Sequence, residues 1–123
     1  MHRDQTLTDR RILVVEDDPL IALDLQDILL KAGAVVIGPA SQLSTADSLI
    51  QQYRLDAAVL DVRLEIGTTL PLADRLAAAG IPFLFQTSDP GAIGDAHPTA
   101  PVLRKPFRSE QLIEALQALL ANR

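Results

Sequence analysis

An aspartate directly follows a short apolar run in the middle of the chain. Residues 57–60 are Ala-Ala-Val-Leu and the next residue is Asp61. Such a run predicts a strand that is buried on both faces and that carries Asp61 to its carboxyl end. Ligands of open α/β sheets bind at that edge. An aspartate there can be a metal ligand, a nucleophile or the cap of the following segment.

Three other predicted strands also end close to polar or charged side chains. Because parallel strands present their carboxyl ends at one edge of a sheet, we expect these side chains to lie near Asp61. They are Glu16 and Asp17 after residues 11–15, Thr87 after residues 82–86, and Lys105 after residues 102–103.

This set of side chains is suited to phosphoryl chemistry. The neighbouring carboxylates of Glu16, Asp17 and Asp61 repel one another unless a cation lies among them, and oxygen ligands suit Mg²⁺. Asp61 can then attack a phosphoryl group to form an acyl phosphate. Lys105 would neutralise the phosphoryl oxygens, and the Thr87 hydroxyl would donate a hydrogen bond to one of them.

Several of the polar residues also have a purely structural interpretation. Asp18 precedes Pro19 and an apolar helical pattern, which favours a helix cap over a metal ligand. Glu16 and Asp17 could be solvated acids of a turn. We expect His97, in an irregular segment, to be exposed to solvent.

The elements that must position these groups alternate along the chain. The pattern predicts five strands joined by helices, and therefore one doubly wound α/β domain with a parallel sheet. Residues 1–10 are expected to be a flexible lead-in and residues 11–123 the domain. The expected strands cover residues 11–15, 35–37, 57–60, 82–86 and 102–103, and the expected helices cover about residues 19–32, 43–53, 71–79 and 109–121. A helix within residues 89–101 should be short or irregular, because that segment holds three prolines.

Composition excludes several functions. The 123 residues have a net charge of −5 and are 3% aromatic, which argues against binding nucleic acid or an anionic membrane. The absence of cysteine excludes disulfides and thiolate metal sites. No apolar run resembles a signal peptide or a membrane span, so we expect a cytoplasmic protein.

Four segments together resemble the receiver domain of two-component response regulators. They are residues 12–18, the strand that ends at Asp61, residues 85–88 and residues 105–107. The resemblance covers residues 11–122. It implies a flavodoxin-like sheet of order 2-1-3-4-5 with helices on both faces, and a signalling protein rather than an enzyme.

The resemblance also implies a role for each site residue. Asp61 would accept a phosphoryl group from a sensor histidine kinase or a histidine phosphotransfer protein, with Thr87 and Lys105 assisting. Mg²⁺ would be held by Glu16, Asp17, Asp61 and the backbone carbonyl of Arg63. The side chains of Arg63 and Asp89 would tune the lifetime of the phosphoryl group. The Lys105-Pro106 bond is expected to be cis.

The chain departs from the family pattern at two places. Val102 occupies the switch position where the family usually has an aromatic residue, and prolines interrupt the stretch from Thr87 to Lys105. Residues 82–87 are similar to a Pro-Phe-x-Phe-x-Thr subgroup of stand-alone receivers that act as phosphate shuttles or kinase modulators. We therefore expect activation to remodel residues 88–101 instead of rotating an aromatic ring. The signal would pass through protein contacts to an unknown target, and the protein is expected to be a monomer or a weak homodimer.

Other functions stay open at this level. One is a receiver-like binding module that works without phosphorylation. Another is a small Mg²⁺-dependent phosphohydrolase, although such enzymes generally carry an acid where this chain has Arg63. A flavin carrier of the same topology is disfavoured because the acids at residues 16–18 would repel its phosphate.

Overall fold

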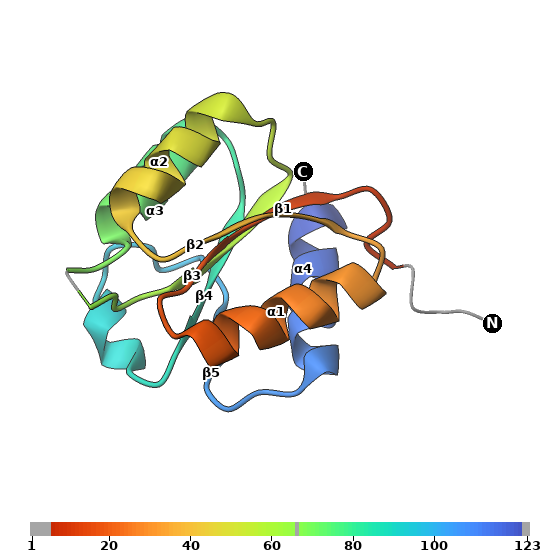
Figure 1. Cartoon of the computed structure of the whole chain (residues 1–123). Coiled ribbons are helices and arrows are strands. Elements are labelled where there is room, and N and C mark those ends of the chain that lie inside the picture. Colours follow the sequence, from red (N-terminus) through yellow and green to blue (C-terminus); the bar gives the residue numbers. More distant parts are fainter. Residues whose placement is uncertain (1–5, 66, 122–123) are drawn as a thin grey trace.

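The computed structural model describes residues 6–65 and 67–121, and its centre is a five-stranded parallel sheet of order β2-β1-β3-β4-β5 (Figure 1). The strands are β1 (Arg11–Val15), β2 (Val35–Ala40), β3 (Ala57–Asp61), β4 (Phe83–Thr87) and β5 (Val102–Arg104). The helices are α1 (Pro19–Lys31), α2 (Leu43–Gln52), α3 (Leu70–Ala78) and α4 (Ser109–Ala121). Among the described residues, no helix is long and apolar enough to cross a bilayer.

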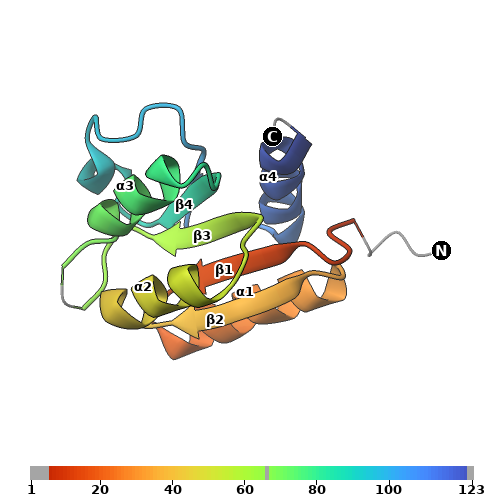
Figure 2. The ribbon, with the colours of Figure 1, turned by 90° about the horizontal axis from the view of Figure 1, so that it is seen from above.

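Helices cover both faces of the sheet. Figures 1 and 2 show α2 and α3 together on one face, with α1 and α4 on the other. Two apolar clusters fill the spaces between these layers: Phe85 and Leu72 belong to the first, and Val59 and Leu116 to the second. The predicted doubly wound, flavodoxin-like fold and its strand order are therefore confirmed.

Helix α1 begins as its sequence predicts. The Asp18 Oδ1 atom accepts hydrogen bonds from the backbone N–H groups of Leu20 and Ile21, at 2.9 and 3.4 Å, and Pro19 occupies the first turn. Gly33, with a φ of 90°, follows the end of the helix. Asp18 is thus a helix cap, and it fixes the direction in which the chain leaves the acids at the end of β1.

Strand β2 is longer than expected, because it continues through Gly38 and Pro39 instead of stopping there. Gly38 adopts a φ of 101°, and a Cβ atom at this position would lie 2.9 Å from the carbonyl oxygen of Val14. Only glycine permits this close approach to β1, at the irregularity in the β1–β2 pairing. The glycine therefore extends the strand rather than ending it.

The segment between β4 and β5 holds one 3₁₀ turn, Pro90–Ile93, as the prediction of a short or irregular helix requires. The expectation that His97 is exposed is wrong. Its side chain is 14% exposed, its Nε2 atom lies 2.8 Å from Asp74 Oδ1, and its ring meets that of Phe83 edge to face at 5.1 Å. His97 anchors the irregular segment to α3 and to β4.

The N-terminal segment joins the fold before Arg11. Residues 1–5 of the expected lead-in lie outside the described residues. Within residues 6–10, the Leu7 side chain is 1% exposed and its backbone N–H donates to the Ala32 carbonyl at 2.9 Å. The apolar core therefore begins at Leu7.

Candidate functional site

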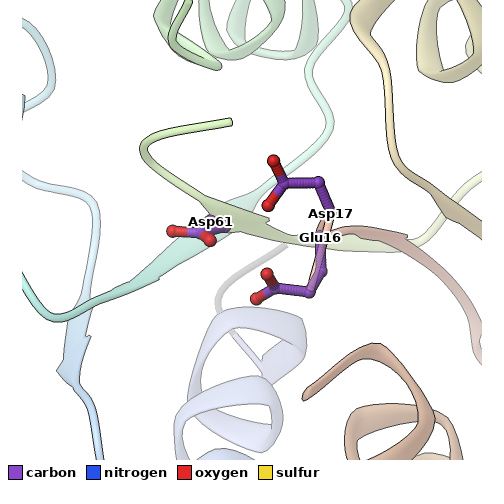
Figure 3. Close-up of side chains that lie close together, drawn as sticks. All are labelled: Glu16, Asp17 and Asp61. Carbon is purple, nitrogen blue, oxygen red and sulfur yellow. The ribbon is translucent and has the colours of Figure 1, made fainter. Parts of the chain in front are cut away.

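Three carboxylates gather at the carboxyl edge of the sheet (Figure 3). Glu16 and Asp17 follow β1, and Asp61 is the last residue of β3, which lies beside β1. One oxygen from each of the three carboxylates can be chosen so that all lie within 4.8 Å of one another. Glu16 and Asp61 are buried and Asp17 is half-buried, so the predicted acids are brought together and are not solvated acids of a turn.

Lys105 supplies a positive charge to this cluster. Its Nζ atom lies 3.1 Å from Asp61 Oδ2 and 3.2 Å from Glu16 Oε1, and its side chain is 17% exposed. The backbone N–H of Lys105 donates to the Thr87 carbonyl at 2.9 Å, and the Lys105-Pro106 bond is cis, as expected. The ammonium group is therefore shared between two buried acids.

Thr87 ends β4 next to the carboxylates. Its hydroxyl oxygen accepts a hydrogen bond from the Asp89 backbone N–H at 2.9 Å, and its side chain is buried. Arg63, two residues after Asp61, pairs with Asp89 through its Nε atom at 3.1 Å. This ion pair joins the loop after β3 to the segment after β4. The part assigned to the Arg63 carbonyl in metal binding stays a prediction.

The environment of Asp61 disfavours its charged form. Burial, and after it the charge of Glu16, raises the pKa of Asp61 to about 6, and the Lys105 ammonium opposes this shift only in part. Among the described residues, the cluster thus holds three carboxylates, of which Glu16 and Asp61 contact the Lys105 ammonium. An additional cation would offset the excess negative charge, and these oxygen ligands suit Mg²⁺.

Two further side chains that sequence reasoning missed support the site. The Thr69 hydroxyl donates to the main-chain carbonyl of Asp61 at 2.7 Å, and the Gln86 Nε2 group donates to Glu16 Oε1 at 2.6 Å. Gln86 follows the apolar residues 83–85 inside a buried strand, and this position of a polar residue was the sequence feature that could have indicated its role. The backbone N–H of Glu65 also donates to Asp17 Oδ2, which fixes that acid against the loop after β3.

No family model matches the sequence, whereas solved structures match over most of the chain. The structure of SdrG from Sphingomonas melonis Fr1 is 38% identical, covers 91% of this chain and 97% of its own, and superposes with a TM-score of 0.81. A response regulator receiver protein from Sinorhizobium medicae WSM419 is 26% identical, covers 94% and 97%, and also gives a TM-score of 0.81. The chain belongs to the response regulator receiver family.

The receiver match also extends to a curated relative and to a second state of SdrG. The transcriptional regulatory protein PdtaR of Mycobacterium tuberculosis is 28% identical over 118 residues, which cover 92% of this receiver and 58% of PdtaR. This receiver thus spans little more than half of that relative's length. A structure of the BeF3-activated conformation of SdrG is 39% identical, with a TM-score of 0.76. Receivers are signalling domains rather than classical enzymes, and this fold supports a phosphoacceptor role in signalling.

Proposed function

We propose that this receiver accepts a phosphoryl group on Asp61 in an Mg²⁺-dependent reaction. The observation that carries the proposal is the contact of Lys105 Nζ with Asp61 Oδ2, at 3.1 Å, inside a cluster of three carboxylates. This arrangement pairs a carboxylate nucleophile with a cation that can neutralise the incoming phosphoryl oxygens. The metal ligands would be Glu16, Asp17, Asp61 and the Arg63 carbonyl.

The proposed transfer is an in-line substitution at phosphorus. An Asp61 carboxylate oxygen forms the new O–P bond, and the P–N bond to the donor's phosphohistidine breaks. The donor imidazole keeps the electron pair of that bond. The Lys105 ammonium then pairs with the negatively charged phosphoryl oxygens, and the Thr87 hydroxyl donates a hydrogen bond to one of them. Bound Mg²⁺ would supply charge neutralisation at the same oxygens.

The signalling role belongs to the same proposal. The phosphoryl donor would be a sensor histidine kinase or a histidine phosphotransfer protein, and the output a protein contact. The Pro-Phe-x-Phe-x-Thr pattern of residues 82–87 favours a stand-alone shuttle or switch. The proposal places the protein in the cytoplasm. The support for this is its similarity to PdtaR, which is named a transcriptional regulatory protein. The less favoured functions are a binding module independent of phosphorylation and a small phosphohydrolase.

Intact mass spectrometry tests the phosphorylation itself. Incubation of the protein with acetyl phosphate and Mg²⁺ is expected to add one phosphoryl group, about 80 Da, as a base-labile acyl phosphate. The same incubation with EDTA should add none. A mass that stays unchanged with Mg²⁺ present would favour the phosphorylation-independent module.

We expect Arg63→Ala and Asp89→Ala to shorten the life of the phosphoryl group without preventing its formation. The exposed Arg63–Asp89 pair ties together the two loops beside Asp61, and its loss should admit water. An exposed pair contributes roughly 0.2–1 kcal/mol, so dephosphorylation should become about 1.4- to fivefold faster. The measurement is the decay of the phosphorylated mass. Arg75→Ala, which breaks the similarly exposed Arg75–Asp47 pair, is the control, and wild-type decay in both test variants would remove the pair from the mechanism.

Phosphorylation is also expected to change the protection of residues 88–101. The Thr87 hydroxyl now accepts from the Asp89 N–H, so a shift of this hydroxyl toward a phosphoryl group would disturb the start of the segment. With Val102 at the switch position, no aromatic ring is available there to move instead. Amide exchange of residues 88–101 with and without phosphoryl donor measures the effect, and α2 serves as the internal reference. Equal exchange in the two states would show the idea to be wrong.

A further inference from the structure

Gln86 makes a hydrogen bond across the strand that carries the proposed phosphorylation site. It lies in β4 opposite Asp61 of β3, and its side chain is fully buried. Its Nε2 group donates to Glu16 Oε1 at 2.6 Å. Because β3 lies between β1 and β4 in the sheet, this bond passes over the end of β3 and connects the two strands that flank Asp61.

The second polar atom of Gln86 shows why a glutamine is unusual here. Among the described residues, Gln86 Oε1 is a buried side-chain oxygen that has no hydrogen-bond partner. A buried polar atom without a partner is destabilising, and an apolar side chain of similar size would avoid this cost. Packing therefore does not explain the residue type, whereas the need for a donor to Glu16 does.

Gln86 and Lys105 share one oxygen of Glu16. Glu16 Oε1 accepts from Gln86 Nε2 at 2.6 Å and from Lys105 Nζ at 3.2 Å, and the backbone N–H of Asp18 donates to Oε2 at 3.0 Å. Lys105 Nζ also reaches Asp61 Oδ2. If Lys105 turns fully to a phosphoryl group on Asp61, Gln86 is left as the side-chain donor to the buried Glu16 Oε1.

We propose that Gln86 is a positioning residue that releases Lys105 for the phosphoryl group. This inference rests on the proposed phosphorylation of Asp61. By holding Glu16 Oε1, the Gln86 amide reduces the cost of moving Lys105 away from Glu16, because a buried carboxylate oxygen left without a donor is strongly disfavoured. Without Gln86, Glu16 would compete with the phosphoryl group for the same ammonium.

The test compares Gln86→Met with Leu84→Met. Methionine is close to glutamine in size and shape but has no N–H donor. Leu84 is a fully buried residue of the same strand and belongs to the apolar cluster of the α1 and α4 face, so its variant controls for the insertion of methionine. NMR titrations would measure two affinities for each protein: that for Mg²⁺ alone, and that for BeF₃⁻ at saturating Mg²⁺.

We expect Gln86→Met to bind BeF₃⁻ about three- to tenfold more weakly, the usual net effect of one lost hydrogen bond, with Mg²⁺ affinity within about twofold of wild type. Leu84→Met should match wild type in both. An equal loss of Mg²⁺ affinity would overturn the proposal, since Gln86 would then only orient a metal ligand. Unchanged BeF₃⁻ affinity would overturn it as well. Failure of the wild type to bind BeF₃⁻ would instead count against phosphorylation of Asp61.

A second measurement uses the unaltered protein. The side-chain amide protons of Gln86 should stay protected from exchange when BeF₃⁻ and Mg²⁺ are bound, because the bond to Glu16 is then expected to persist. Loss of that protection in the BeF₃⁻ complex would contradict the inference even if Gln86→Met did not fold.

Discussion

The variant Asp61→Asn is expected to gain no phosphoryl group from acetyl phosphate and Mg²⁺. An asparagine amide is a poor nucleophile, and it also removes one of the three carboxylates of the proposed metal site. Lys105 would keep Glu16 as its partner, so the fold around the site should persist. The expected result is therefore a complete loss of the mass gain of about 80 Da, without unfolding.

The control for this experiment is Asp47→Asn. Asp47 lies on α2 and pairs with Arg75 away from the carboxylate cluster. Its variant should gain one phosphoryl group as the wild type does. If Asp61→Asn still gained about 80 Da, the acceptor would be another residue and the proposed chemistry at Asp61 would be wrong.

The substitution Asp61→Asn should also stabilise the folded protein at neutral pH when metal is absent. In the folded chain the pKa of Asp61 is about 6, whereas an unfolded chain releases this proton near the ordinary value of about 4. Between these values the folded state binds more protons, so its stability falls as the pH rises from about 4 to about 6. At pH 7 the loss is of the order of 2–3 kcal/mol.

Urea unfolding in EDTA at pH 4.5 and pH 7 measures this effect. The wild type should lose stability between the two pH values by more than Asp61→Asn, and the variant should be the more stable protein at pH 7. Asp47→Asn, whose acid lies outside the cluster, should follow the wild type. Parallel pH profiles for Asp61→Asn and the wild type would show that the burial of Asp61 is not destabilising.

The grouping of the acids and Lys105 could be predicted because it follows from topology alone. Asp61, Glu16 and Lys105 stand at or near strand ends, and parallel strands bring those ends to one edge whatever the details of packing. Sequence reasoning could not find the part played by Gln86. Its importance depends on which oxygen of Glu16 its amide reaches across β3 and on what Lys105 contacts, and neither is visible in a one-dimensional pattern.

The errors have equally local causes. Gly38 and Pro39 normally end a strand, but here glycine lets β2 approach the Val14 carbonyl and continue. His97 was expected to be exposed because its segment lacks periodicity. Its burial depends on tertiary contacts with Asp74 and Phe83, which come from an earlier helix and strand.

The irregular segment after β4 is mechanically constrained by side-chain contacts at Asp89 and at His97. Asp89 is tied to Arg63 and Thr87, and eight residues later His97 is tied to Asp74 and Phe83. A displacement that begins at Thr87 can therefore shift the loop after β3 through Arg63, or α3 through His97. We therefore expect the His97–Asp74 contact to couple this segment mechanically to α3, in addition to its coupling to the loop after β3 through Arg63.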